Sequence, residues 1–167
     1  AIAGGASHVG FVFFAPSPRN LSRDRAAQLA ARVPGHVARV GVMVNPDDTL
    51  VDQAIAAGQL EVLQLHDTPP ARAAFGGVAD RILYDAKTPP GAALPGGMGV
   101  RFDWHLLDGF RHPLPWALSG GLDPQNVAEA VAVTKATLVD VSSGVESAPG
   151  IKDATRIRAF LEVVRDL

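Results

Sequence analysis

The stretch Leu118-Ser119-Gly120-Gly121 ends a short apolar run in two glycines, and Val141-Ser142-Ser143-Gly144 repeats that break further along the chain. A helix-like segment follows each break. In neighbouring parallel strands such loops meet at one edge of the sheet, where glycines let backbone N–H groups and helix N-termini approach an anion. One glycine pair alone would indicate an ordinary turn. The two together predict an α/β enzyme that acts on a small phosphorylated molecule.

Composition favours a single globular domain. The chain has 167 residues, of which 47% are hydrophobic and 19% are charged, and this is enough for a sizeable core. The net charge of −2 offers no broad cationic field for nucleic acid or an anionic membrane. No apolar run approaches the ~20 residues that cross a bilayer, and residues 1–5 lack the cationic start of a signal peptide. These features predict a cytoplasmic enzyme.

The sequence gives no sign of a metal site. Cysteine is absent, which excludes disulfide bonds and thiolate zinc sites within these residues. His36, His105 and His112 do not have the spacing of metal ligands. We therefore expect neither a metal nor another cofactor.

Short apolar runs alternate with helical patterns along the chain. The runs are near-continuous, as in parallel strands that are covered on both faces. Ser22, Asp123 and Asp153 are suitable N-caps, and Pro124 suits the first helical position after Asp123. The alternation predicts βα units and a parallel sheet. Strands are expected at residues 8–14, 37–44, 60–66, 81–85, 115–119 and 138–142, and helices at 23–32, 49–57, 103–108, 124–133 and 154–164.

Two places interrupt this rhythm. Residues 1–5 read as the glycine-terminated end of a helix whose preceding strand is not present. Residues 67–80 hold one short helix, or have lost a strand and a helix. Six strands and two interruptions add up to eight, the number that closes a (β/α)8 barrel. We thus expect residues 1–167 to form a single barrel domain that covers about six of the eight βα units.

Nine short motifs follow one another through nearly the whole chain. They are Gly10-Phe11-Val12-Phe13 with Ser17-Pro18-Arg19, Val40-Gly41-Val42-Met43-Val44-Asn45, Gln64-Leu65-His66, Asp85-Ala86-Lys87, Gly96-Gly97-Met98-Gly99 with Phe102-Asp103-Trp104, Leu118-Ser119-Gly120-Gly121-Leu122, Asn126-Val127, Asp140-Val141-Ser142-Ser143-Gly144-Val145-Glu146 and Pro149-Gly150-Ile151-Lys152-Asp153. None is specific alone, but in this order they resemble the phosphoribosylanthranilate isomerase family of tryptophan synthesis. The resemblance implies a (β/α)8 barrel. It also implies the Amadori rearrangement of N-(5′-phosphoribosyl)anthranilate to 1-(2-carboxyphenylamino)-1-deoxyribulose 5-phosphate.

Two parts of the family pattern are missing. Members begin with a Lys-Ile-Cys-Gly strand whose cysteine is the general base, and they carry another strand and helix before the Asp-Ala-Lys strand. Both gaps coincide with the interruptions described above, and Pro16 replaces a family lysine. Either the polypeptide is truncated or intervening residues are missing from the sequence. We favour the second, because a six-stranded remnant leaves unpaired edges and an unfilled interior. If intervening residues are missing, one pair of consecutive Cα atoms within residues 71–77 should be separated by more than the usual ~3.8 Å.

The resemblance assigns the general acid to Asp85, which ends the fourth expected strand. Protonation of the furanose ring oxygen opens the ring to a Schiff base, and a base then removes the C2′ proton. An acid that works near neutral pH needs a pKa raised by an apolar surround or a nearby anion. The alternative is a carboxylate that caps the next turn or pairs with Lys87. No residue of this sequence takes the place of the cysteine base.

Four further residues are expected around the substrate. By resemblance Arg19 meets the anthranilate carboxylate as a bidentate guanidinium; the alternative is a solvated loop arginine. His66 either lines the pocket or packs at the end of its strand. Gln64 lies on the same face two residues earlier, and we expect it to be a polar group of the barrel interior rather than a ligand contact. Asp140 lies near the ribose hydroxyls, or is a buried aspartate at the barrel floor.

The phosphate is expected at Gly120, Gly121, Ser143 and Gly144, because barrel enzymes often bind phosphate after strands seven and eight. The glycine-rich loop at residues 95–99 is a candidate for closing over the substrate. The remaining assignments are structural: Phe102 and Trp104 as core anchors, and Lys135 and Lys152 as solvated helix faces.

Two other functions are considered beside the isomerase. A non-catalytic phosphosugar-binding remnant lacks the base, and an intact mass of about 17.4 kDa favours it. Indole-glycerol-phosphate synthase is disfavoured, because its strand-end lysines and glutamate are not found in order. The expected partner is a small phosphorylated sugar–anthranilate substrate, with no nucleic acid and no membrane, bound by a monomer or a homodimer.

Overall fold

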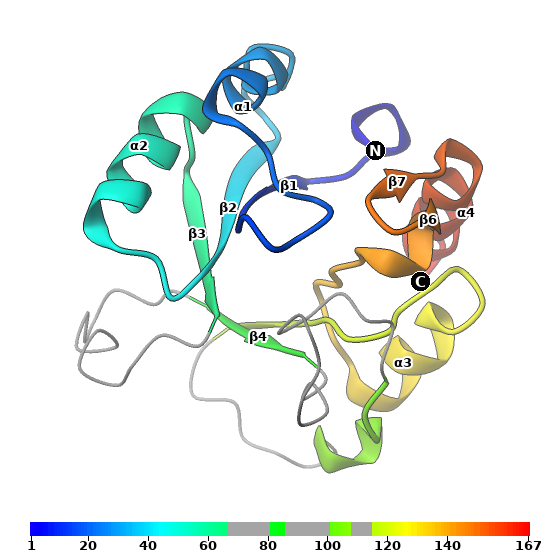
Figure 1. The fold of residues 1–167 in the computed structure, drawn as a ribbon. Coiled ribbons are helices and arrows are strands. Elements are labelled where there is room, and N and C mark those ends of the chain that lie inside the picture. Colours follow the sequence, from blue (N-terminus) through cyan, green and yellow to red (C-terminus); the bar gives the residue numbers. More distant parts are fainter. Residues whose placement is uncertain (67–80, 86–100, 108–114) are drawn as a thin grey trace. The chain divides into compact units, whose positions relative to one another are not determined.

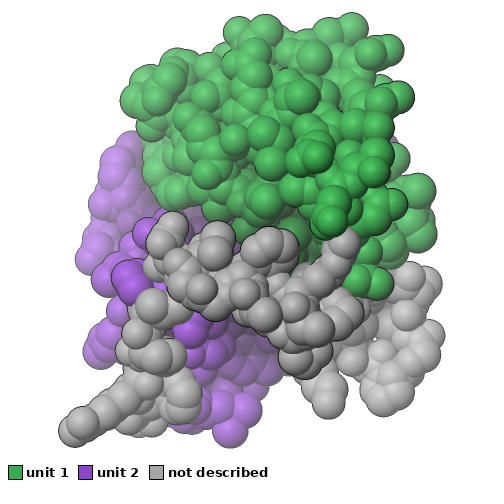
Figure 2. All heavy atoms as spheres, turned by 90° about the vertical axis from the view of Figure 1, so that its left-hand side faces the viewer, with its two compact units in different colours: residues 1–74 green, residues 75–167 purple. Residues whose placement is uncertain are grey.

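The computed structural model describes residues 1–66, 81–85, 101–107 and 115–167. Its chain divides into two compact units, unit 1 (Ala1–Ala74) and unit 2 (Phe75–Leu167), which are coloured separately in Figure 2. Each unit has its own parallel strand pairing and its own hydrophobic core. The break predicted at residues 71–77 lies outside the described residues.

Unit 1 is built on three parallel strands, β1 (His8–Phe13), β2 (Ala38–Val44) and β3 (Val62–His66), in the order β1–β2–β3 (Figure 1). They confirm the first three expected strands. Phe11 lies beside Gly41, and Gly41 beside Leu63. Because the strands run in the same direction, their carboxyl ends share one edge of the sheet.

The helices of unit 1 lie within two residues of the predicted bounds, 23–32 and 49–57. Ser22 accepts a hydrogen bond from the N–H of Arg25 at the start of α1 (Arg23–Ala30), and Asp47 caps α2 (Asp48–Gly58). After the 3₁₀ turn η1 (Ile2–Gly4), Gly5 has a φ of 93°, which confirms the glycine-terminated helical end. The core of unit 1 comes from both strands and helices: Phe11, Phe13, Ala26, Ala30, Met43 and Ala54.

An ion pair joins β2 to the residue before β3. Arg39 donates from Nη2 to Oε1 of Glu61 over 2.9 Å, and its backbone N–H donates to Oε2 over 2.9 Å. The Glu61 N–H donates in return to the carbonyl of Arg39. These hydrogen bonds, first among them the one from the Arg39 side chain, hold the pKa of Glu61 below its usual 4.5.

Glu61→Gln is therefore expected to lower the melting temperature slightly at pH 7. A carboxylate with a lowered pKa stabilises the folded state above its unfolded pKa, and this stabilisation disappears as the pH falls through the folded pKa. The melting temperatures of wild type and Glu61→Gln should differ at pH 7 and converge as the pH falls below the lowered pKa of Glu61. Glu162→Gln, at an exposed position of the C-terminal helix, is the control. Equal melting temperatures for wild type and Glu61→Gln at pH 7 contradict the prediction.

In unit 2, β4 (Ile82–Tyr84) pairs in parallel with β5 (Trp116–Leu118). The strand expected at residues 138–142 is reduced to a parallel bridge between Leu118 and Val139. Leu118 donates to the carbonyl of Leu138 over 3.0 Å, and Asp140 donates to the carbonyl of Leu118 over 2.8 Å. The pairing is as predicted, but the regular strand is shorter, since the chain leaves the extended region at Ser142, where ψ is −80°.

The helices of unit 2 follow the prediction less closely. The helix expected at 103–108 is, in its described part, the 3₁₀ turn η2 (Trp104–Leu107). Asp153 caps α4 (Ala154–Arg165) as expected. The 3₁₀ turn η3 (Ser143–Val145) and the antiparallel hairpin of β6 (Glu146–Ala148) and β7 (Ile151–Lys152) were not predicted.

The helix expected from residue 124 is shorter at its start. Helix α3 (Val127–Thr134) begins three residues later. Asp123 caps the turn before it, because its Oδ1 accepts hydrogen bonds from the N–H groups of Gln125 and Asn126, each over 2.9 Å. The prediction that Asp123 is the N-cap of this helix was wrong, because the N-cap position is Asn126 and Asp123 caps the turn that leads into the helix.

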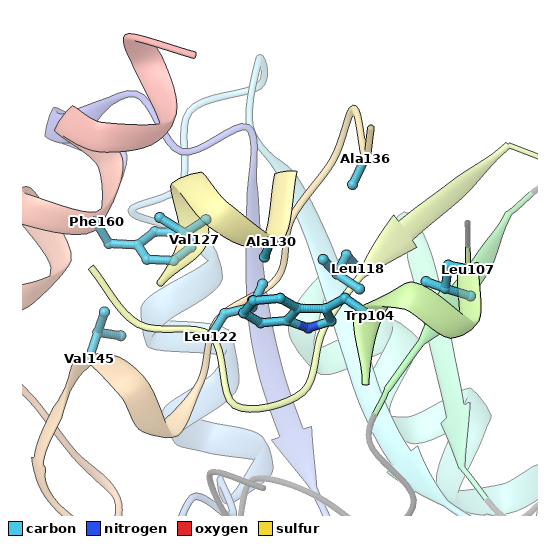
Figure 3. Packing of buried hydrophobic residues seen from close by; sticks show 9 residues of the cluster. All are labelled: Trp104, Leu107, Leu118, Leu122, Val127, Ala130, Ala136, Val145 and Phe160. Carbon is cyan, nitrogen blue, oxygen red and sulfur yellow. The ribbon is translucent and has the colours of Figure 1, made fainter. Parts of the chain in front are cut away.

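The core of unit 2 is larger than that of unit 1. Trp104 packs in the middle of the cluster drawn in Figure 3, and Phe102 lies against it in a partly buried position. Both are core residues, as predicted. Tyr84 and Trp116 meet edge to face at the β4–β5 pair. The cluster joins η2, β5, α3, η3 and α4 and two residues of the loops between them: Trp104, Leu107, Leu118, Leu122, Val127, Ala130, Ala136, Val145 and Phe160.

None of the helices in the described part of the chain has the length and apolar character needed to cross a membrane.

Candidate active site

The two glycine loops of unit 2 lie against each other. Gly120 and Gly121 follow β5 with φ angles of 90° and 64°, in the left-handed region that glycine enters without strain. An ideal Cβ on Gly144 would lie 1.9 Å from the carbonyl oxygen of Leu122. The second loop therefore rests on the backbone of the first with no space for a side chain between them. The loops that the sequence pattern predicted to adjoin do so.

Both loops border one cavity of about 180 Å³. This is several times the ~30 Å³ that a water molecule occupies in the liquid, so a phosphate group fits. The cavity is lined by backbone-rich loop residues and by one pair of opposite charges: Arg101, Gly121, Leu122, Asp123, Ser143 and Gly144.

Arg101 and Asp123 were not identified from the sequence as site residues. Arg101 Nη2 donates to Asp123 Oδ2 over 2.9 Å, and the two side chains are 52% and 24% exposed. Both residues flank motifs of the nine-motif series, next to Phe102 and Leu122. Their position beside those motifs was the available signal.

Lys152 has a different role from the predicted solvated helix face. It lies in β7, and its Nζ donates to Glu146 Oε1 and to the carbonyl of Ser142, each over 2.8 Å. The Glu146 side chain is 4% exposed, and its Oε2 accepts from the N–H of Gly150 over 3.2 Å. The prediction was wrong because the hairpin brings Lys152 back onto the Ser142 loop, and this contact cannot be read from local periodicity.

The predicted acid and its neighbours lie at the carboxyl ends of the strands of unit 2. Asp85 follows β4 directly and is partly buried. Tyr84 is paired with Leu118, so Asp85 and Ser119 follow their strands at the same edge. Ser119 Oγ donates to Asp140 Oδ2 over 3.0 Å. Asp140 is an exposed residue, which overturns the alternative of a buried aspartate at the barrel floor.

Unit 1 carries the other predicted residues at the carboxyl edge of its sheet. Arg19 lies in the loop after β1, where its N–H donates to Ser17 Oγ over 3.1 Å. Asn20 holds this loop closed by accepting from the N–H of Phe14 over 2.8 Å. Arg19 is partly buried and takes part in a further interaction, so it is not a simple solvated loop arginine.

Gln64 and His66 lie on one face of β3, as predicted. The Gln64 amide nitrogen lies 3.0 Å from Nε2 of His66. The two side chains therefore contact each other on that face of β3.

Some of the predictions fall outside the described residues, namely the closing loop at 95–99 and the pairing of Asp85 with Lys87. Within the described ranges, no group of three or more His, Asp and Glu side chains is arranged to hold a metal ion.

The sequence and the fold can be compared with known proteins. The profile of the family N-(5'phosphoribosyl)anthranilate (PRA) isomerase matches residues 1–75 and 71–163. An N-(5'-phosphoribosyl)anthranilate isomerase of Zymomonas mobilis subsp. pomaceae is 48% identical over an alignment that covers 99% of this chain and 90% of the relative. The phosphoribosyl anthranilate isomerase of Thermotoga maritima has a TM-score of 0.83 at 30% identity, covering 99% of this chain and 91% of that structure.

A further structure carries a ligand. It is a phosphoribosyl anthranilate isomerase in complex with reduced 1-(o-carboxyphenylamino)-1-deoxyribulose 5-phosphate, with a TM-score of 0.78 at 31% identity and coverage of 99% of this chain and 91% of that one. The alignment with the Zymomonas relative runs over 194 positions, whereas this chain has 167 residues, so at least 27 aligned positions have no residue here. By profile, sequence identity and a shared (β/α)8-barrel fold, the chain belongs to the N-(5'-phosphoribosyl)anthranilate isomerase family.

Proposed function

We propose that this protein isomerises N-(5′-phosphoribosyl)anthranilate to 1-(2-carboxyphenylamino)-1-deoxyribulose 5-phosphate, a step of tryptophan biosynthesis. The observation that carries the proposal is the cavity that both glycine loops border, in a chain that belongs to this enzyme family. Backbone N–H groups of Gly121, Ser143 and Gly144 are suited to a phosphate, with Gly120 giving the turn that exposes them. Anchoring the phosphate fixes the sugar for the reaction at its other end.

The proton that opens the ring is assigned to a residue at a strand end. By the family pattern, the C2′ proton is removed by a cysteine, and that cysteine is not among these 167 residues. Asp85 donates the proton that opens the furanose ring, and Asp140, oriented by the hydroxyl of Ser119, is placed for the ribose hydroxyls. In unit 1, Arg19 binds the anthranilate carboxylate through its planar fork. His66 and Gln64 bind or border the substrate without removing its proton.

A non-catalytic phosphosugar-binding protein is the second candidate. It is favoured by one observation, the absence of cysteine from the 167 residues, since the base of the family is a cysteine. The phosphate cavity is common to both candidate functions, so binding of a phosphorylated ligand does not distinguish them. Turnover of the substrate does distinguish them.

The test is a fluorescence assay with the purified 167-residue chain. We expect the fluorescence of N-(5′-phosphoribosyl)anthranilate to fall faster with the protein than without it. The reduced product analogue, added first, should slow this loss and should bind in calorimetry in competition with inorganic phosphate. Binding of the analogue without turnover supports the phosphosugar-binding candidate. Absence of both binding and turnover contradicts both candidates.

We also propose that the unmatched positions include one βα unit of the family between unit 1 and unit 2. The two profile matches meet at residues 71–75, close to the boundary between the units, and the shortfall of at least 27 positions approaches the length of a βα unit. A cytoplasmic location and a monomeric or homodimeric state are part of the same proposal.

A further inference from the structure

The wall of the phosphate cavity contains a carboxylate. Asp123 lies beside Gly121 and Leu122, and a phosphate dianion in the cavity would meet its negative charge. Two like charges a few ångströms apart repel each other at the effective dielectric of a protein surface. A cavity built for a dianion therefore needs a compensating cation, and Arg101 has that position.

Asp123 is fixed in place by its surroundings. Its Oδ1 accepts from two backbone N–H groups, and its own N–H donates to Asn126 Oδ1 over 2.9 Å. Asn126 is buried, and its amide donates to the carbonyl of Gly121 over 2.9 Å. This network ties the carboxylate to the first glycine loop, so Oδ2 is a stationary acceptor for Arg101.

Arg101 is held at one end and open at the other. Its Nη2 is bound to Asp123, while the side chain keeps 52% of its surface exposed and lines the cavity. A guanidinium has five N–H donors in a planar fork, which matches a phosphate better than an ammonium does. The remaining donors are available to a ligand that enters the cavity bordered by both glycine loops.

We propose that Arg101 binds the phosphate dianion of the substrate, and that Asp123 holds its guanidinium at the cavity. The proposal rests on the function proposed above and deepens it, because the glycine loops alone describe a phosphate site without a basic side chain. Of the lining residues in the described part of unit 2, Arg101 alone carries a positive charge. Its contribution to the binding affinity should therefore be larger for the phosphate dianion than for the monoanion.

The test compares Arg101→Gln with the wild type and with Arg158→Gln, which removes an exposed arginine from α4. Dissociation constants of inorganic phosphate and of the reduced product analogue are measured by calorimetry at constant ionic strength, at pH 5 and pH 7.5. Melting temperatures are recorded in chloride and in phosphate. The second pKa of a phosphate monoester such as the product analogue is near 6, so the two pH values sample its monoanion and its dianion.

Loss of a charge-assisted hydrogen bond is expected to weaken phosphate binding by Arg101→Gln about 10- to 100-fold at pH 7.5. In wild type the affinity should increase from pH 5 to pH 7.5, and in Arg101→Gln this increase should be smaller. The melting temperature of Arg101→Gln in chloride should equal that of wild type. Arg158→Gln should bind both ligands with wild-type affinity. Wild-type affinity and pH dependence in Arg101→Gln would overturn the proposal. So would an equal fall in melting temperature with and without phosphate, because that is the behaviour of a structural ion pair. If the wild type itself binds neither phosphate nor the analogue, it is the proposed function that fails.

Discussion

Gly144→Ala is expected to lower the free energy of unfolding by ~2 kcal/mol or more and to weaken phosphate binding at the same time. The added Cβ would lie 1.9 Å from the Leu122 carbonyl oxygen and 3.0 Å from the Cα of Asp123. Both neighbours are backbone atoms, so relief requires the two glycine loops to move apart. Overpacking of this kind typically costs ~1–3 kcal/mol, and here the displaced backbone is the wall of the cavity.

The measurement is urea unfolding together with phosphate calorimetry. Gly35→Ala is the matched control, because an ideal Cβ there meets nothing within 4 Å and its φ is not in the left-handed region. That variant should stay within ~0.5 kcal/mol of the wild type and bind phosphate normally. Similar unfolding midpoints for the two variants would show that the loops separate without cost, contrary to their packing in this structure.

Local patterns were sufficient to predict unit 1. Its strands are near-continuous apolar runs. Ser22 marks the start of α1 because its side chain accepts a hydrogen bond from the N–H of Arg25, three residues later, and this spacing can be recognised in the sequence. The glycine loops of unit 2 were predictable for the same reason. Gly120 and Gly121 need a left-handed backbone, and glycine is the residue that signals this locally.

Pairings over long sequence separation were not predictable in this way. Arg101 and Asp123 are 22 residues apart and meet only because the chain folds back on the glycine loop. Lys152 reaches Ser142 through a hairpin whose strands are too short to give an alternating pattern. Both side chains are common on solvated surfaces, so composition carries no signal for their role. The glycines of the cavity could thus be predicted from local sequence, whereas the charged residues beside it are brought together only by the tertiary structure.

The division of roles between the cavity and Asp85 has a direct consequence for catalysis. In the proposed mechanism the cavity binds the phosphate whether or not the ring opens, which is uniform binding and affects affinity. The proposed acid, Asp85, acts only as the ring oxygen takes up its proton, so its loss should appear in the turnover rate and leave affinity unchanged.

Asp85→Asn is accordingly expected to reduce turnover of N-(5′-phosphoribosyl)anthranilate by about 10²- to 10⁴-fold, the usual contribution of a general acid. Asparagine keeps the size of the side chain but cannot supply the proton. Because Asp85 follows β4 and is separate from the residues that line the cavity, the dissociation constants of phosphate and of the reduced product analogue should remain at their wild-type values. Asp52→Asn, on the exposed surface of α2, controls for the loss of one carboxylate.

The readouts are the single-turnover fluorescence decay and the rise in melting temperature that phosphate induces. A retained rise with lost turnover assigns the proton transfer to Asp85, because the fold and the phosphate site are then intact. Wild-type turnover in Asp85→Asn would remove the acid from the mechanism and leave the strand end after β4 as a structural feature. A parallel loss of turnover and of phosphate binding would mean that Asp85 supports the loops after β5, since its neighbour Tyr84 accepts the hydrogen bond of the Ser119 N–H over 2.7 Å.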